Sequence, residues 1–380
     1  MSKLIKFLSV LIINLSVVSI YAAESPPAKS LLVLFNSNPE FVNQWNQTIE
    51  NLHPMPDGSP NIWEGKTEED LINFIDDWYY FLPSLHDGLD KIYAFSMLYY
   101  KNKAGQEWIL SETTIQWTLE FVQSRGDYMD SPDSLIGVKL LMNHPEIILD
   151  DYIIPDEGFT SFNDFFTKSL KAGKRPITKP SDDGVLVSPA DGILQWINND
   201  LTLDGHIPTK GEMALSLNAL LENSDYAKQF VGGSALATFL MPDDYHHYHA
   251  PVSGSLVESR EHVGKRLFGM NDFPAMLNKG NPGYNKPFSV IENFIHGYFI
   301  FKTENYGYVA MIPVGLHTVG SVTFENPLKE VNSDNPIYIS KGERLGNFAY
   351  GGSTVLLLFE QGRLSSLSVR QGQQIGRLIK

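Results

Sequence analysis

The sequence predicts an α+β fold in which a helical N-terminal domain precedes a mainly β domain of the sandwich or partly open barrel type. Before residue 150, apolar residues recur at helical spacing, as in Phe41, Trp45 and Ile49. From Gly184 onward, short apolar runs are separated by glycine and proline, which is the pattern of buried strands. An acidic, proline-containing segment at 150–158 separates the two patterns and places the domains at 24–150 and 151–380.

Four helices are expected in the N-terminal domain, at 39–52, 68–82, 111–122 and 131–142. Thr67, Ser111 and Ser131 are suitable N-cap residues, and Pro83 ends the second helix. The aromatic residues of this region, such as Trp78 and Trp117, are interpreted as core; the alternative is an aromatic substrate pocket.

The second domain opens with a short helix at 160–166 and a basic loop at 171–176, which is either a solvated loop or a site for phosphate or carboxylate. Strands are expected where the chain is apolar or extended, at 185–187, 235–240, 288–301, 308–314, 343–350 and 355–359.

The composition excludes several classes of function. The chain has 380 residues, 43% of them apolar, and a formal net charge of −15. This charge repels nucleic acid and does not favour anionic membrane surfaces. Because cysteine is absent, disulfides, thiolate catalysis and cysteine-ligated metal sites are excluded.

The first 23 residues have the pattern of a signal peptide. Lys3 and Lys6 precede an apolar stretch at 7–20, and two small residues, Ala22 and Ala23, end it. The apolar stretch is shorter than the roughly 20 residues of a membrane span. We therefore expect export with cleavage of the signal; the alternative is an uncleaved membrane anchor.

A Gly-Gly-Ser-Thr segment at 351–354 lies between two expected strands. In one interpretation it is an ordinary turn. In the other, the hydroxyl group of Ser353 attacks the carbonyl carbon of Gly352. Short segments of this kind are too unspecific to decide alone.

Two other segments carry groups able to do chemistry. Asp191 lies in a tight turn, where it either bonds its own backbone or acts on a neighbour. Three histidines, His246, His247 and His249, occur within four residues. They form a metal site in which His247 and His249 join an aspartate, an acid–base site, or a hydrogen-bonded surface cluster.

Five segments in this order resemble the phosphatidylserine decarboxylase family. They are 162–166 (Phe-Asn-Asp-Phe-Phe), 188–192 (Ser-Pro-Ala-Asp-Gly), 244–254 (Asp-Tyr-His-x-x-His-x-Pro-Val-x-Gly), 314–321 (Val-Gly-x-x-x-Val-Gly-Ser) and 341–354 (Lys-Gly-Glu-x-x-Gly-x-Phe-x-x-Gly-Gly-Ser-Thr). The helical region before them, notably 102–134, resembles the N-terminal domain of soluble members that include L-tryptophan decarboxylases.

The resemblance implies a self-cleaving enzyme that carries a pyruvoyl group. Ser353 would attack Gly352, and β-elimination would leave the pyruvoyl group at the start of the fragment 353–380. His249 matches the base that acts on the serine, and Asp191 matches the carboxylate that orients this base. His246 matches the residue that serves decarboxylation, whereas His247 matches no functional position.

Elementary energetics agree that a group of this kind is needed. Enzymes usually lower reaction barriers by about 8–23 kcal/mol, and a positioned acid or base supplies only about 10²–10⁴-fold. When an α-amino acid loses CO₂, an electron sink must supply the rest of this barrier reduction. A pyruvoyl carbonyl is such an electron sink and needs no external cofactor or metal.

The sequence favours phosphatidylserine as the substrate, with phosphatidylethanolamine and CO₂ as products. The rival in the same chemistry is a soluble decarboxylase of free, perhaps aromatic, L-amino acids. A zinc hydrolase built on His247 and His249 and a non-catalytic binding protein are alternatives of other classes. Peripheral contact with a membrane and a homodimer are the further expectations.

Overall fold

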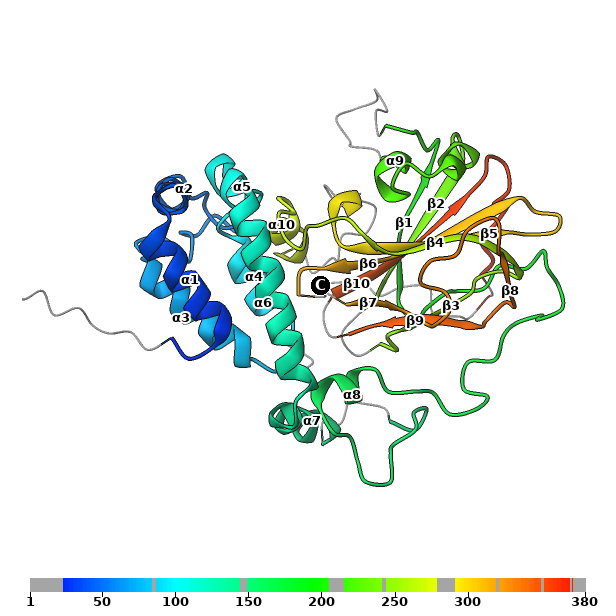
Figure 1. Cartoon of the computed structure of the whole chain (residues 1–380), viewed down its shortest axis with the longest axis horizontal. Helices are drawn as coiled ribbons and strands as arrows, with labels where there is room; N and C mark the ends of the chain where they lie inside the picture. The colour runs from blue at the N-terminus through cyan, green and yellow to red at the C-terminus, as the bar shows by residue number, and fades with distance from the viewer. Residues whose placement is uncertain are drawn as a thin grey trace, which may run out of the picture.

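The computed structural model describes residues 23–83, 87–143, 149–204, 215–240, 244–278, 291–318, 321–349, 352–369 and 371. Helices gather at one end of this structure and strands at the other (Figure 1). Of the expected signal peptide, only Ala23 lies within the described residues. No helix among the described residues combines the length and apolar character needed to cross a bilayer.

The N-terminal region is helical, as predicted. Its helices are α1 (Pro26–Ser37), α2 (Pro39–Glu50), α3 (Glu68–Tyr80), α4 (Asp90–Ser96), α5 (Lys103–Ile109), α6 (Glu112–Asp130) and α7 (Leu135–Met142). The expected caps of α3 and α6 are confirmed, because Thr67 forms a capping box with Asp70 and Ser111 accepts from the Thr114 N–H. The Ser131 cap is wrong: its hydroxyl donates to the Tyr128 carbonyl, and a 3₁₀ turn precedes α7.

Two antiparallel sheets form the C-terminal part. The larger has the order β1-β2-β10-β6-β5-β4-β8, and the smaller has the order β3-β9-β7. The strands are β1 (Ile193–Asn199), β2 (Ser234–Leu240), β3 (His247–His249), β4 (Gly254–Val263), β5 (His296–Lys302), β6 (Tyr308–Leu316), β7 (Val322–Phe324), β8 (Ile337–Ile339), β9 (Arg344–Phe348) and β10 (Gly352–Phe359). An apolar cluster lies between the sheets, so the sandwich prediction is confirmed.

One expected strand, 185–187, is absent. This segment runs without ladder pairing, and its backbone contact to the sheet region is the Val187 N–H donating to the Pro251 carbonyl at 3.1 Å. Three apolar residues in a row are too weak a signal to separate a strand from an extended loop. The short helices α8 (Phe162–Phe166), α9 (Leu217–Leu220) and α10 (Phe273–Asn278) complete the elements.

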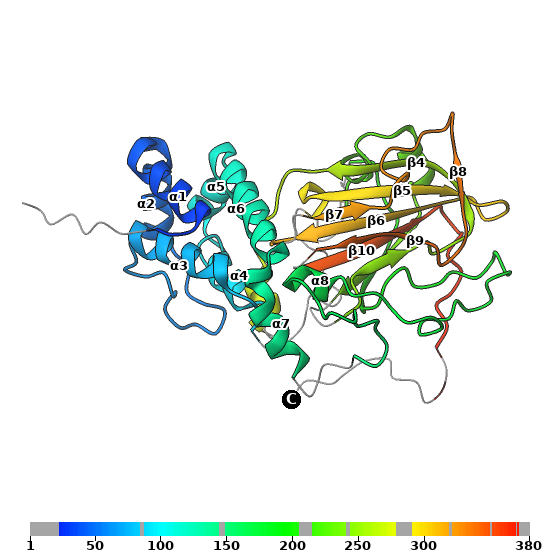
Figure 2. The same ribbon diagram turned by 60° about the horizontal axis from the view of Figure 1, so that its bottom comes forward.

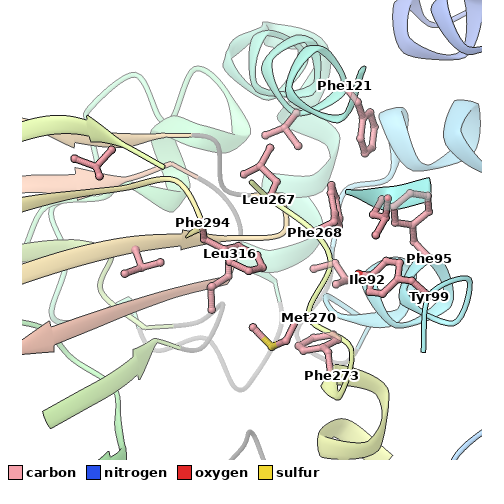
Figure 3. Packing of buried hydrophobic residues seen from close by; sticks show 14 of the residues in the cluster. Ile92, Phe95, Tyr99, Phe121, Leu267, Phe268, Met270, Phe273, Phe294 and Leu316 are labelled. Carbon is pink, nitrogen blue, oxygen red and sulfur yellow. The ribbon is translucent and has the colours of Figure 1, made fainter. Parts of the chain in front are cut away.

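The helical region packs directly on the larger sheet. One apolar cluster contains residues of α3, α4 and α6 together with residues of β5, β6 and β10. At the junction, the ring of Phe268 lies 5.1 Å from that of Phe95 and 6.0 Å from that of Trp78 (Figure 3). Trp78 and Trp117 are fully buried, so the core interpretation of these aromatics is confirmed. The boundary at residue 150 stays a prediction, since this cluster crosses it.

A third, small apolar cluster joins α7 and α8 beside the two larger ones. Its members are Met129, Val138, Leu141, Phe159, Phe162, Phe165 and Phe166. Figure 2 shows α8 next to α7 at the lower end of the helical region. This cluster therefore joins α8 to the helical region, and the ring of Phe166 in α8 lies 3.8 Å from that of His246, just before β3.

Candidate functional site

Ser353 is the second residue of β10, the third strand of the larger sheet. It lies opposite Leu240 of β2 and opposite Gly315 of β6. The preceding strand β9 belongs to the smaller sheet, so the segment at 351–354 does not join two paired strands, and its residues 352–354 lie in β10. Gly352 begins β10, and Gly351 lies outside the described residues. The chain thus passes from one sheet to the other just before the bond that the sequence marks for cleavage.

The side chain of Ser353 is buried and has no hydrogen bond. Its exposed fraction is 0%, and Oγ has no hydrogen-bond partner among the described residues. Because side chains alternate along a strand, Ser353 shares a face with Val355 and Leu357, which pack between the two sheets. A buried hydroxyl without a partner costs about 1–3 kcal/mol, so its persistence needs a functional explanation.

His246 lies just before β3 of the smaller sheet and is fully buried. Its ring centroid is 3.8 Å from that of Phe166, and its carbonyl accepts from the Phe348 N–H at 2.9 Å. Neither ring nitrogen makes a well-formed hydrogen bond to a described residue. Burial, reinforced by the charge of Lys168, lowers the pKa of His246 to about 3. The ring is therefore neutral in the unliganded protein.

His249 lies at the end of β3, with both ring nitrogens engaged. Its Nδ1 is 2.9 Å from the carbonyl oxygen of Gly342, and its Nε2 is 3.1 Å from the hydroxyl oxygen of Tyr245. Burial lowers the pKa of His249, and the negative charge of Asp191 acts in the opposite direction. The ring is a neutral base whose orientation is fixed from two sides.

Gly342 explains why the sequence has Lys-Gly-Glu at 341–343. Its φ of +85° suits glycine, and a Cβ there would lie 2.4 Å from Cγ1 of Ile177. Lys341 is buried and donates to the carbonyl oxygens of Asp182 and Val185. These residues hold the loop that presents the Gly342 carbonyl to His249, a role that the sequence alone did not reveal.

Asp191 precedes β1 and is held by an arginine. The guanidinium of Arg175 contacts both carboxylate oxygens of Asp191, with Nη2 2.8 Å from Oδ2, and donates through Nη1 to Asp151 at 2.8 Å. Arg175 comes from the basic loop, which thus contacts carboxylates of the chain itself. Asp191 lies near enough to His249 to act on it electrostatically. The carboxylate of Asp191 accepts its hydrogen bonds in the described structure from Arg175.

His247 points to a different neighbour. Its Nε2 lies 2.8 Å from the carbonyl oxygen of Thr167, and burial lowers its pKa to about 4. A bulge between Tyr248 and His249 separates its ladder position from that of His249. Within the described residues, no group of three histidine or acidic side chains is placed to hold a metal ion, so the zinc-site interpretation has no geometric support there.

One buried histidine of this region carried no sequence signal. His317 directly follows Leu316, which lies opposite Gly352. It has a φ of +57°, its ring centroid is 4.2 Å from that of Phe273, and neither ring nitrogen has a partner among the described residues. A single histidine in an apolar sequence context is not distinguishable from a core residue, which is why sequence reasoning missed it.

Comparison with known proteins identifies the family. The model of the family described as "Phosphatidylserine decarboxylase" matches residues 162–377. A protein of Fusobacterium nucleatum named "Phosphatidylserine decarboxylase proenzyme" is 31% identical over 239 residues, which cover 63% of this chain and 73% of that protein. A protein of the same name from Clostridium novyi is 32% identical over 244 residues, 64% of this chain and 76% of that protein.

A protein of rice, "Phosphatidylserine decarboxylase proenzyme 2", is 32% identical over 241 residues, 63% of this chain and 36% of that longer protein. The family match begins at Phe162, so it covers α8 and both sheets but not the helices α1–α7. Ser353, Asp191, His246 and His249 all lie inside the matched range. The chain therefore belongs to the phosphatidylserine decarboxylase family, which makes it a carboxy-lyase that depends on a pyruvoyl group.

Proposed function

We propose that this chain is a proenzyme that cleaves itself between Gly352 and Ser353 and then converts phosphatidylserine to phosphatidylethanolamine and CO₂. The observation that carries the proposal is the buried, unpartnered Oγ of Ser353 at the start of β10, in the residue whose nitrogen is bonded to the Gly352 carbonyl carbon. Membership in the family supports the reaction.

Self-cleavage follows from groups that the chain itself supplies. The Oγ of Ser353 bonds to the Gly352 carbonyl carbon while the Gly352–Ser353 amide bond breaks, which leaves an ester. β-Elimination then breaks the bond between Oγ and Cβ and frees the Gly352 carboxylate. Water replaces the nitrogen of residue 353, which departs as ammonia. The new N-terminal group fits the site, because it removes the buried hydroxyl that had no partner.

His249 and Asp191 serve the first of these steps. His249 is neutral at neutral pH and therefore able to accept the proton of Ser353. The negative charge of Asp191 stabilises the imidazolium that results. This requires the His249 ring to exchange the hydroxyl group of Tyr245 for that of Ser353, because the Nε2 of His249 is bonded to Tyr245 before cleavage.

His246 serves decarboxylation. The pyruvoyl group supplies the electron sink that accepts the charge left by CO₂. One proton must then be delivered to the carbon that lost the carboxylate, and we assign this transfer to His246, a buried imidazole just before β3 whose ring nitrogens make no well-formed hydrogen bond to a described residue. Phe166 covers its ring and limits the access of water, so the proton is delivered within a dry site.

The substrate and the compartment complete the proposal. The N-terminal signal exports the protein, with an uncleaved anchor as the alternative. Contact with the bilayer is peripheral and involves α7, where Ile136 and Leu140 lie one turn apart with exposed fractions of 65% and 72%. The protein acts as a homodimer, which is the usual symmetric assembly of soluble oligomers.

The test is the intact mass of the purified protein together with its activity. The wild type is expected to yield two chains that end at Gly352 and begin at residue 353, and Ser353→Ala is expected to yield one chain. The cleaved protein is then assayed on phosphatidylserine vesicles and on free L-tryptophan. An uncut but active wild type refutes self-cleavage, and turnover of the free amino acid alone refutes the lipid substrate.

A further inference from the structure

We infer that Tyr245 is a positioning residue for His249: its hydroxyl group donates to Nε2, holds the ring in place and stabilises the neutral imidazole. The inference rests on the proposed role of His249 in self-cleavage. It concerns a residue of the histidine-containing segment to which the sequence assigned no role.

The two hydrogen bonds of His249 leave one arrangement of protons for a neutral ring. The carbonyl oxygen of Gly342, 2.9 Å from Nδ1, can only accept a hydrogen bond. Nδ1 must therefore carry the proton, and Nε2 must present its lone pair. The hydroxyl group of Tyr245, 3.1 Å from Nε2, is then the donor.

The surroundings of Tyr245 hold this hydroxyl in place. The residue is 6% exposed. Its ring is stacked on that of His247 with 4.9 Å between centroids, and it lies 5.7 Å from the ring of His249. Burial raises the pKa of Tyr245 to about 12, so the hydroxyl stays protonated over the physiological range.

The hydroxyl group also affects how readily His249 accepts a proton. A donor at Nε2 stabilises the neutral ring, and protonation of Nε2 breaks this donor bond, so that the buried hydroxyl group must turn to accept instead. Removal of the hydroxyl therefore raises the pKa of His249. The charged and titratable groups that face this ring are Asp191 before β1, Arg344 on β9 and His247 on β3, and a change at Tyr245 leaves all three in the chain.

A matched control lies three residues away. Tyr248 is 0% exposed, and its hydroxyl group donates to the Thr323 carbonyl at 2.8 Å. Tyr248→Phe thus removes a buried tyrosine hydroxyl of the same segment, but one that does not bond a histidine. Any difference between Tyr245→Phe and Tyr248→Phe reports on His249 and not on the general loss of a buried hydrogen bond.

The first measurement is made on full-length precursor that cannot cleave, Ser353→Ala, labelled with ¹⁵N in its histidines. NMR is expected to show His249 protonated on Nδ1. Adding Tyr245→Phe is expected to raise the midpoint of its titration by about 0.4–1 pH unit, the equivalent of one neutral hydrogen bond. Adding Tyr248→Phe is expected to leave tautomer and midpoint unchanged. Equal behaviour of the two variants overturns the inference.

The second measurement is the pH dependence of self-cleavage in chains made by cell-free synthesis and moved to buffers between pH 5 and pH 9. Tyr245→Phe is expected to move the acid limb of the rate profile to higher pH, since the base must be neutral. Tyr248→Phe is expected to keep the wild-type midpoint, whatever its effect on the rate. A Tyr245→Phe midpoint equal to that of Tyr248→Phe contradicts the inference.

His249→Ala separates the inference from the proposed function. If this variant cleaves as fast as the wild type, the assignment of His249 as the base is wrong. The NMR titration still decides whether Tyr245 stabilises the neutral ring of His249, because it does not depend on cleavage.

Discussion

Ser353 lies opposite Gly315 in the antiparallel register of β10 and β6, and opposite Leu240 on the other side. The residue marked for cleavage thus begins a strand that is hydrogen-bonded to both neighbours over its whole length. Its apolar residues from Val355 to Phe359 are buried. Cleavage before Ser353 removes one covalent bond and leaves these contacts in place.

The first prediction is that the fragment 353–380 stays bound after self-cleavage. The fragment buries five apolar side chains and takes part in two ladders of backbone hydrogen bonds. The free energy that these contacts contribute greatly exceeds the entropic gain from releasing one short fragment. Native mass spectrometry should give one complex with the mass of both chains, and denaturing conditions should separate them. Release of the fragment in native buffer contradicts this account of β10.

Gly342→Ala should slow self-cleavage and reduce stability. A side chain at φ +85° costs about 1–2 kcal/mol, and the contact with Ile177 adds about 1–3 kcal/mol. The displaced carbonyl would also release Nδ1 of His249. Gly173→Ala is the control, because its φ is +79° and no atom lies within 4 Å of the new Cβ. Gly342→Ala should lower the thermal unfolding temperature and the cleavage rate more than Gly173→Ala does.

Asp191→Asn should slow self-cleavage by about 10²-fold, because the amide no longer stabilises the charged His249. Asp151→Asn is the matched control, since Asp151 also binds Arg175 but has no role in the proposed site. The rates are compared by gel after cell-free synthesis. If the two variants cleave equally slowly, Asp191 acts through the Arg175 network and not on the histidine.

Stability should fall as the pH drops from about 6.5 toward 4. Burial places the pKa values of His246 and His317 at about 3 and that of His247 at about 4, below the ordinary value of 6.5. Between these limits the unfolded chain binds more protons than the folded protein, so acid favours unfolding. Each such histidine adds about 1.4 kcal/mol per pH unit to the slope of the free energy of unfolding against pH.

His317→Phe tests this slope, because the ring is surrounded by Phe268, Phe273 and Phe294 and a phenyl group suits that environment. The free energy of unfolding is measured with denaturant between pH 5 and pH 6.5. Its slope against pH should correspond to the uptake of about one proton fewer on unfolding than in the wild type. An unchanged slope in His317→Phe shows that this histidine is protonated in the folded protein.

Replacement of Ile136 and Leu140 by serine should weaken binding to phosphatidylserine vesicles by roughly tenfold or more, because each side chain loses about 1 kcal/mol or more of apolar burial. Vesicle flotation measures the binding, and turnover of a short-chain, monomeric phosphatidylserine should stay unchanged. Val33→Ser, at a 60% exposed residue of α1, is the control. Equal flotation of all three proteins excludes α7 as the contact.

Much of the fold followed from local patterns. The helices α2 and α3 and the strands β2, β6 and β10 were predicted close to their observed bounds, because their apolar periodicity is strong, whereas α6 continues to Asp130, eight residues beyond its predicted end. The segment 185–187 failed because three residues carry too little pattern. The packing of Phe268 on Phe95 was not predictable, since residues far apart in sequence meet only through the tertiary fold.

The sequence by itself determined the family, through the order of five segments, and it predicted the Gly352–Ser353 bond as the cleavage site and Asp191, His246 and His249 as the residues that serve it. Only the tertiary structure decided the protonation of these groups and their partners. The carbonyl of Gly342 and the hydroxyl of Tyr245, not Asp191, bond to the ring of His249. Burial beneath Phe166 makes His246 neutral. Hydrogen bonds and desolvation depend on neighbours from distant parts of the chain, which no local pattern specifies.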